Sequence, residues 1–233
     1  MSQQSSASLE RRSFLTRLNT GIASFAAMAG AAMAQEKSTS NARYEPARHE
    51  KDDWLDQLPG KHRVVFDTTT PEGFGDALFF ANNYVRVNKS EYALESGELA
   101  VVIVARHRTT QFAYNDAIWA KWGRPLAERA RVEDPKTRIA PKINIYNTPG
   151  FGDILTNRGV TVDTVFKENV HLAVCSISTR GYASGIVAAL GGKVDEVFQE
   201  LIANLVGSNA RMVPAGIVTV NRAQERGYTL VST

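Results

Sequence analysis

Residues Leu99–Ala105 read LAVVIVA, and this stretch decides the fold class of the chain. An unbroken run of apolar residues that is rich in Val is typical of a strand buried on both faces, as in a parallel sheet. Two other stretches share this character, Arg63–Thr68 (RVVFDT) and Val170–Ile177 (VHLAVCSI). A last strand is predicted over Tyr228–Val231.

Helical segments separate these strands. Gly216–Val220 is ambiguous, since its β-branched residues also fit a strand, but Pro214 favours the start of a helix. Strands that alternate with helices predict a single α/β domain whose mostly parallel sheet is covered by helices on both faces. The spacing of apolar residues predicts helices over Gly75–Val87, Gln111–Trp122, Phe151–Asn157, Gly181–Leu190, Val194–Leu205 and Ala215–Glu225.

Residues 1–34 resemble an export signal of the twin-arginine type. Arg11-Arg12-Ser13-Phe14-Leu15 is the core of that pattern. Ala32-Met33-Ala34 fits the site of a signal peptidase, so cleavage is predicted after Ala34 and the mature protein is expected to be periplasmic or otherwise exported. An uncleaved anchor is the alternative, but Gly21–Ala34 is shorter than the ~20 residues that span a bilayer. We therefore expect no stable membrane insertion after cleavage.

The charge balance does not indicate a nucleic-acid partner. The predicted signal contains Arg11, Arg12, Arg17 and Glu10, so its removal lowers the formal net charge from +3 to +1. A nearly neutral chain lacks the basic surface that nucleic-acid binding needs.

The rest of the chain is predicted to form a linker and one domain. Residues 35–60 are polar, apart from an apolar cluster around Trp54 and Leu55 that is expected to dock on the domain. Residues 61–233 fit one domain of ordinary size. Cys175 is the only cysteine, so no disulfide bond forms within the chain even in an oxidising compartment.

Candidate site residues follow the ends of two predicted strands. The carboxyl ends of parallel strands gather at one edge of a sheet, where ligands usually bind. A thiol near guanidinium groups, an imidazole and a helix N-terminus is readily held as a nucleophilic thiolate. Free cysteines are also among the most buried residues, so Cys175 equally fits an inert position in the core. The candidate catalytic residue is Cys175, and the candidate binding residues are Arg106, His107, Arg108, Ser176, Ser178 and Arg180.

The sequence predicts neither a metal site nor a cofactor. The histidines, His49, His62, His107 and His171, are scattered, and Cys175 has no partner cysteine for a pair of metal ligands. A phosphate loop ending in GKS or GKT is absent from the sequence. A nucleotide-binding relative of flavodoxin is therefore the least supported interpretation.

Two stretches resemble the DsrE/DsrF-like sulfur-relay family. In the first, Asn157-Arg158-Gly159-Val160 precedes Val170–Cys175, so a Gly-Val step leads to a strand that ends at a cysteine. In the second, Val213-Pro214-Ala215-Gly216-Ile217 precedes Arg222–Tyr228, which is similar to the closing helix and Gly-Tyr strand of that family. The resemblance covers about residues 61–233, with an insertion over about 124–147.

The resemblance implies a flavodoxin-like sheet, a homo-oligomer, and a cysteine that carries sulfur as a persulfide. In this chain that role falls on Cys175, with a sulfur donor or acceptor protein as partner. The leading hypothesis is an exported sulfur carrier whose thiolate is held charged by Arg106, His107, Arg108 or Arg180. The alternative is a non-catalytic oligomeric module that binds a small anionic ligand or a protein partner.

Overall fold

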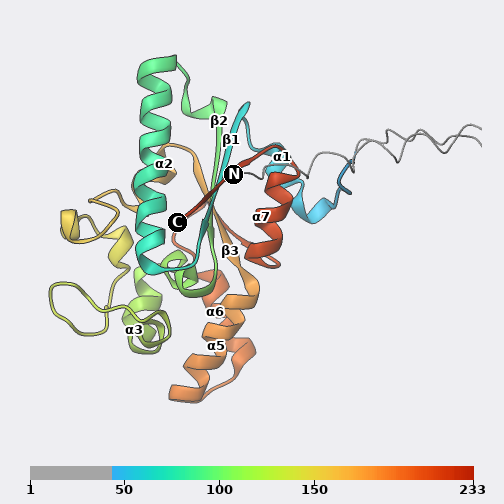
Figure 1. Cartoon of the computed structure of the whole chain (residues 1–233). Coiled ribbons are helices and arrows are strands. Elements are labelled where there is room, and N and C mark those ends of the chain that lie inside the picture. Colours follow the sequence, from blue (N-terminus) through green and yellow to red (C-terminus); the bar gives the residue numbers. More distant parts are fainter. Residues whose placement is uncertain (1–43) are drawn as a thin grey trace, which may run out of the picture. The chain divides into compact units, whose positions relative to one another are not determined.

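The structure is a computed structural model that describes residues 44–233 (Figure 1). The predicted signal, 1–34, and the first part of the predicted linker, 35–43, lie outside the described residues. The chain divides into two units, Met1–Tyr44 and Glu45–Thr233, and the fold described below is that of the second.

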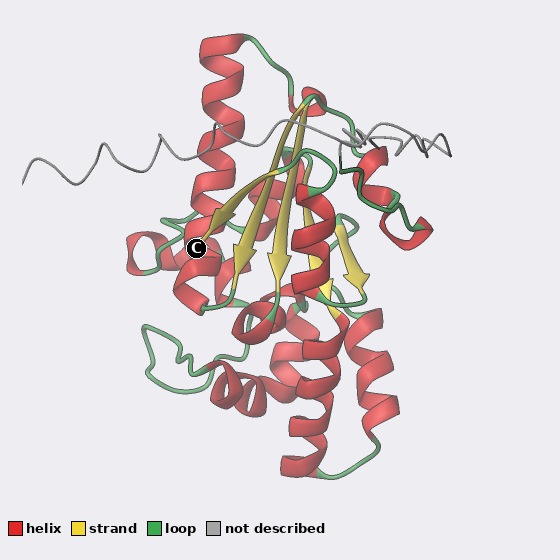
Figure 2. Ribbon diagram, turned by 45° about the vertical axis from the view of Figure 1, so that its right-hand side comes forward, coloured by secondary structure: helices red, strands yellow, loops and turns green. Residues whose placement is uncertain are grey.

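Five strands form one sheet in the order β4-β3-β2-β1-β5. Every neighbouring pair is parallel, and the arrowheads in Figure 2 point toward one edge. The predicted α/β class with a parallel sheet is thus confirmed, and the arrangement is consistent with a flavodoxin-like domain. The strands are β1 (His62–Thr68), β2 (Leu99–Ala105), β3 (Val170–Cys175), β4 (Ala210–Val213) and β5 (Thr229–Ser232).

Helices cover both faces of the sheet. The α-helices are α1 (Trp54–Gln57), α2 (Pro71–Tyr92), α3 (Asp116–Ala130), α4 (Val162–Lys167), α5 (Ser176–Leu190), α6 (Val194–Ala203) and α7 (Gly216–Gln224). The 3-10 helices are η1 (Glu50–Asp52), η2 (Ser96–Glu98), η3 (His107–Ala113), η4 (Ile145–Asn147) and η5 (Pro149–Ile154). None of the helices within residues 44–233 is long and apolar enough to cross a membrane.

The strand order determines which face each helix covers. From β1 to β4 the chain moves across the sheet in one direction, so right-handed crossovers place α2, α3, α4 and α5 on one face. The return from β4 to β5 places α7 on the other face, beside α1 (Figure 1). Alternate residues of β2 serve the two cores: Val101 and Ile103 pack on the α2 side, whereas Val102 and Val104 pack on the α7 side.

The segment around Trp54 is held against the domain by polar as well as apolar contacts. Trp54 and Leu55 are buried in the core on the α7 side. The hydroxyl of Tyr228 donates to the carbonyl of Leu55 at 2.7 Å, and Arg63 donates to the same carbonyl at 2.9 Å. Residues 45–60 therefore belong to the same compact unit as the sheet.

Helix α3 begins later and ends later than the prediction of Gln111–Trp122. The segment before it is the 3-10 helix η3, and α3 continues to Ala130 through Pro125. The helix bends at Trp122, where φ is −128° and ψ is 21°. Pro125 therefore lies in the first turn after the bend, where its missing N–H and fixed φ are tolerated.

Several further boundaries differ from the prediction. Helix α2 begins at Pro71 and ends at Tyr92, beyond both ends of the predicted Gly75–Val87. Strand β3 ends at Cys175, and α5 begins at Ser176 instead of Gly181, so Ser176 and Ser178 lie in the first turn of a helix. The helix predicted over Phe151–Asn157 is not formed as an α-helix, because residues up to Ile154 belong to the 3-10 helix η5 and the rest form a bend and a turn. Helix α4 and strand β4 were not predicted, whereas the helical alternative for Gly216–Val220 is confirmed by α7.

Candidate functional site

The end of β3 lies at the point where the topology of the sheet reverses. Strand β3 leads into α5 on one face, while its neighbour β4 leads into α7 on the other face. Loops that diverge to opposite faces leave a crevice at the carboxyl ends of the strands, which is the usual ligand site of such sheets. Cys175 and Val213 are register partners at these two ends. Cys175 therefore stands at the switch point.

Cys175 is also the residue that caps helix α5. Its Sγ accepts a hydrogen bond from the backbone N–H of Ser178 at 3.5 Å, and its carbonyl accepts one from the hydroxyl of Thr179 at 3.0 Å. The N-terminus of a helix carries a partial positive charge, which favours a negatively charged sulfur. The side chain is buried, with 5% of the residue exposed.

Ser178 connects the thiol to the loop that follows β2. Its hydroxyl accepts a hydrogen bond from the backbone N–H of His107 at 3.0 Å. His107 has a left-handed backbone with φ of 56°, which is uncommon for a residue other than glycine. The Nδ1 atom of the exposed His107 ring lies 3.4 Å from the carbonyl of Thr69 at the end of β1. Loops from three strands thus meet beside Cys175.

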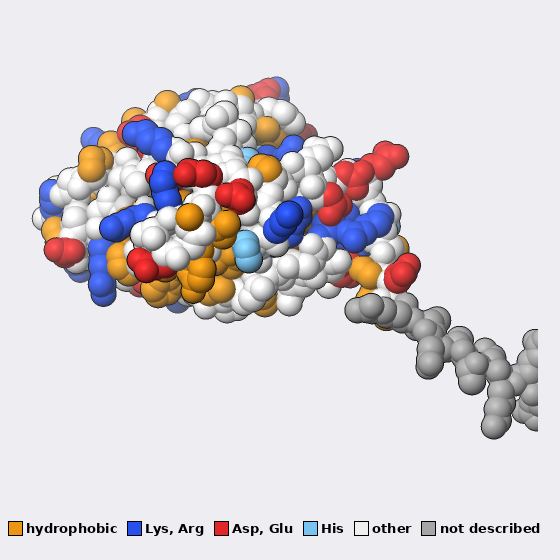
Figure 3. All heavy atoms as spheres, turned by 90° about the horizontal axis from the view of Figure 1, so that it is seen from above, with side chains coloured by type: hydrophobic (Ala, Val, Ile, Leu, Met, Phe, Trp, Pro, Cys, Tyr) orange, Lys and Arg blue, Asp and Glu red, His pale blue; other side chains and the backbone are white. Residues whose placement is uncertain are grey.

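A cavity of about 460 Å³ opens at this place. Its lining carries three guanidinium groups and no carboxylate, and consists of His107, Arg108, Arg129, Arg131 and Ser178. Arg108, Arg129 and Arg131 form no ion pair with any described residue. We call this cavity the arginine cavity. Its strong local charge is not a property of the whole surface, because the end of the molecule seen in Figure 3 mixes basic and acidic side chains.

Arg129 is held by helix α5 without being neutralised. Its guanidinium carbon lies 4.9 Å from the centre of the Tyr182 ring. A Cβ added to Gly181 would lie 2.5 Å from Nη2 of Arg129, so the guanidinium group packs against the bare backbone of that glycine. Burial raises the pKa of Tyr182, while the charges of Arg129 and Arg108 act in the opposite direction. Both guanidinium groups therefore lie close to the same tyrosine.

Arg108 is fixed through its backbone and leaves a side-chain donor unused. Gln111 donates from Nε2 to the carbonyl of Arg108 at 2.6 Å and accepts from the hydroxyl of Tyr182. The Nε of Arg108 is buried and has no hydrogen-bond partner among the described residues. Buried polar groups are normally hydrogen-bonded, so this donor is an exception among the described residues.

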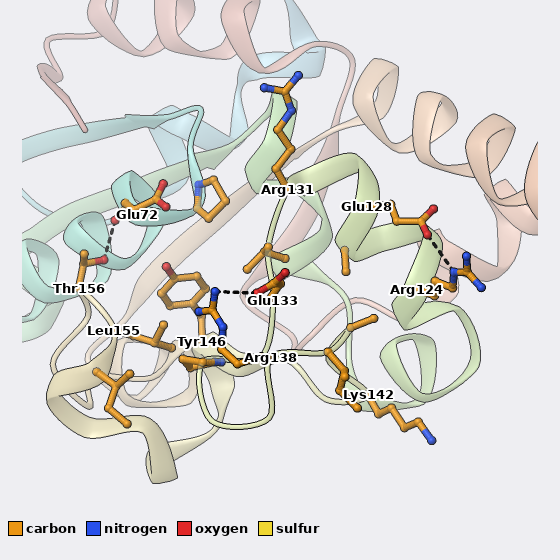
Figure 4. Close-up of a pocket in the computed structure, with 17 residues that line it drawn as sticks. Glu72, Arg124, Glu128, Arg131, Glu133, Arg138, Lys142, Tyr146, Leu155 and Thr156 are labelled. Atoms are coloured by element: carbon orange, nitrogen blue, oxygen red, sulfur yellow. Dashed lines mark hydrogen bonds and ion pairs between the residues drawn. The ribbon is translucent and has the colours of Figure 1, made fainter.

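A larger neighbouring groove, of about 1010 Å³, has a different electrostatic character (Figure 4). Three carboxylates line it beside four basic side chains, and two of the bases are paired: Arg124 with Glu128 at 2.8 Å and Arg138 with Glu133 at 3.0 Å. Arg131 lines both the groove and the arginine cavity, and Figure 4 draws it without an ionic partner. The groove therefore offers an anion much less net positive charge than the arginine cavity does.

The structure brings some of the sequence-predicted residues together and separates others. Cys175, Ser178, His107 and Arg108 lie in or beside the arginine cavity. Arg106 instead forms a two-point ion pair with Asp67, with distances of 2.6 Å and 2.8 Å.

Arg180 and Ser176 stand apart from the cavity. Arg180 is exposed and pairs with Asp195 of α6 at 2.9 Å, while its guanidinium group lies over the ring of Phe198. Ser176 is the first residue of α5 and does not line the cavity. Neither side chain is in a position to hold an anion there.

Sequence reasoning missed Arg129 and Arg131. Both lie at the C-terminal end of α3. The prediction considered only residues that follow the carboxyl ends of strands. A basic residue in the last turn of a helix is ordinary, because it complements the helix dipole. The signal in the sequence was that the two arginines are two residues apart at the end of a helix. This spacing does not indicate a site unless the path of α3 is known.

Together the fold and the site define a parallel α/β protein with a capped thiol next to an arginine-lined cavity. Among the described residues, no group of three or more His, Cys, Asp or Glu side chains is placed to hold a metal ion. No family model matches the chain, and neither do the curated proteins or the solved structures compared with it.

Proposed function

We propose that this protein is an exported, DsrE-like sulfur carrier in which Cys175 holds sulfane sulfur as a persulfide. The observation that carries the proposal is the position of Sγ, which caps helix α5 next to the arginine cavity. The outer sulfur of a persulfide is an anion at neutral pH. The helix N-terminus and the nearby guanidinium groups both stabilise this negative charge.

Arg106 adds a further positive charge that acts on the thiol. Its pKa is raised, first by the hydrogen bond to Asp67 and to a smaller extent by the charge of Cys175. The guanidinium group therefore stays protonated and acts on the sulfur through space, although its hydrogen bonds go to Asp67. Arg106 is a positioning residue in this proposal.

The resemblance to the DsrE family supports the same assignment. The quoted tail motif begins at Val213, which is the register partner of Cys175, so the two similar stretches meet at one edge of the sheet. The export of the protein rests on the pattern around Arg11-Arg12 and Ala34, and the homo-oligomer and the donor or acceptor protein rest on the resemblance. N-terminal sequencing of the secreted protein tests the export and the cleavage site. Light scattering of the purified protein tests the homo-oligomer.

One observation favours a second candidate, a module that binds an anion without thiol chemistry. Only 5% of Cys175 is exposed, whereas Arg129 and Arg131 are exposed around the cavity. In that case the cavity holds the ligand and Cys175 is part of the core.

Sulfur loading distinguishes the two functions. The full-length protein is incubated with sodium polysulfide, and its intact mass is measured before and after reduction. Because Cys175 is the only cysteine, a reducible gain of one sulfur atom reports on that residue alone. We expect this gain in the wild type and none in Cys175→Ser. No gain in the folded wild type, or the same gain in Cys175→Ser, would reject the carrier.

A further inference from the structure

We infer that the arginine cavity binds the sulfur donor itself, as a small divalent sulfur oxyanion of the thiosulfate class. This inference rests on the proposed function, because it names the substrate from which Cys175 takes its sulfur. It is carried by Arg129 and Arg131, which nothing in the family resemblance involves, and by the connection from the cavity to the thiol through Ser178.

The charge of the cavity suits a dianion. Three guanidinium groups line it, no carboxylate lines it, and no described residue neutralises them by an ion pair. Like charges gathered around one space repel one another, and a bound anion relieves that repulsion. Arg108, one of the lining residues, keeps its Nε unpaired among the described residues, and the N–H groups of a guanidinium are donors for oxygen acceptors.

The geometry of the cavity suits an oxyanion in particular. Guanidinium groups donate two parallel hydrogen bonds to pairs of oxygen atoms, as in carboxylates and phosphates. The hydroxyl of Ser178 and the imidazole of His107 add polar groups to the same lining. Arg129 is already oriented by the ring of Tyr182 and the backbone of Gly181, so less side-chain freedom is lost when an anion binds.

The size of the cavity suits a small donor. A volume of about 460 Å³ holds a small ion with its waters, whereas a folded donor protein would have to present a narrow projecting group. Ser178 lies between the cavity and the thiol, and its backbone N–H donates to the Sγ of Cys175. The terminal sulfur of an anion bound in the cavity therefore approaches Sγ past Ser178.

The transfer step is a displacement at sulfur that needs no further reactant. The Cys175 thiolate attacks the terminal sulfur of the thiosulfate dianion, and a new S–S bond forms to Sγ. The original S–S bond breaks, and its electron pair leaves with sulfite. The protein is left with a persulfide anion, so charge and atoms balance without an added oxidant. The guanidinium groups stabilise the sulfite dianion as it departs.

Binding is tested apart from chemistry in the full-length Cys175→Ser variant. Calorimetric titration at low salt uses sodium thiosulfate and, separately, sodium sulfate. We expect both dianions to bind, and we expect Arg129→Gln and Arg131→Gln each to weaken binding about tenfold, as the loss of a charge-assisted hydrogen bond does. Arg124→Gln is the matched control, because Arg124 is exposed and paired with Glu128 in the neighbouring groove, and it should bind normally.

A second pair of variants keeps every charge and changes only the shape of the site. Gly181→Ala adds a methyl group that would lie 2.5 Å from Arg129, whereas Gly185→Ala on the same helix meets nothing within 4 Å. We expect weaker thiosulfate binding in the first and unchanged binding in the second. Absence of binding, or binding that is unaffected by Arg129→Gln, Arg131→Gln and Gly181→Ala, would overturn the anion site.

Loading experiments separate this inference from the proposed function. In the wild type, we expect thiosulfate to load sulfur on Cys175 and sulfate to inhibit the loading competitively. Loading by polysulfide but not by thiosulfate would reject the donor named here and leave the sulfur carrier standing. Arginine-dependent anion binding with no loading from either donor would reject the carrier and with it the donor, leaving an anion-binding module.

Discussion

The backbone N–H of Ser178 donates to the Sγ of Cys175 across 3.5 Å. The same residue accepts a hydrogen bond from His107 through its hydroxyl and contributes to the lining of the arginine cavity. One residue in the first turn of α5 thus connects a buried thiol to a cavity that carries three arginines. The chemistry proposed for this protein depends on that connection, because Cys175 itself is almost fully covered.

The ion pair between Asp67 and Arg106 should contribute to stability. Both side chains are mostly buried, with 12% and 25% exposed, and their two-point geometry is short. Asp67→Asn leaves the guanidinium group without its charged partner, so we expect the free energy of unfolding to fall by about 2 kcal/mol, as for a lost hydrogen bond to a charged group. Urea denaturation measures the change.

The matched control for Asp67→Asn is Glu128→Gln. It breaks the exposed i,i+4 pair with Arg124, and such pairs contribute only about 0.3–0.5 kcal/mol. An equally small effect of Asp67→Asn would show that the Arg106 pair adds no more than a surface pair does.

His171 should make the protein less stable in mild acid. Its pKa is lowered from 6.5, first by burial and then by the charge of Arg211 on the neighbouring strand. The unfolded chain therefore takes up a proton at a higher pH than the folded chain, and stability falls as the pH drops below about 6.5. We expect His171→Gln to weaken this loss, measured as urea midpoints between pH 7 and pH 5.

The control for the histidine prediction is His62→Gln, at the exposed start of β1. It should leave the pH dependence close to that of the wild type. If His171→Gln and the wild type lose stability in parallel over this range, then the half-buried imidazole of His171 is not the source of the acid sensitivity.

Gly123 permits close contact between α3 and the segment that follows it. A Cβ at this position would lie 2.0 Å from the carbonyl oxygen of Pro141, which is backbone and cannot turn aside. We expect Gly123→Ala to lower the free energy of unfolding by about 1–3 kcal/mol, the usual cost of an overfilled core. Scanning calorimetry measures the change. The control is Gly97→Ala, whose added methyl group meets nothing within 4 Å, and it should unfold like the wild type.

How much the sequence predicts depends on how each element is buried. Leu99–Ala105 was predicted with its observed ends, because a central parallel strand is apolar at every position. Strand β4 was missed, since it is a short edge strand whose sequence ARMV is only partly buried. The prediction for α3 ended at Trp122, where the helix bends before it continues through Pro125.

The candidate site was predicted in part for a similar reason. Cys175, His107, Arg108 and Ser178 follow strand ends, and the topology of a parallel sheet brings such residues together. Arg180 also follows a strand end, but it lies in a helix where its side chain turns to Asp195. The arginines of α3 reach the cavity only through the path of the whole helix, which local patterns do not encode.

The central claim is that Cys175 is a reactive thiolate reached through the arginine cavity, and alkylation of the folded protein tests it most directly. The rates of labelling by anionic iodoacetate and neutral iodoacetamide are compared by mass spectrometry, in the wild type and in Arg129→Gln. We predict that Cys175 is labelled in the folded wild type. The ratio of the iodoacetate rate to the iodoacetamide rate should be higher in the folded protein than in the unfolded chain, and Arg129→Gln should lower this ratio. Labelling that occurs only after unfolding would contradict the account.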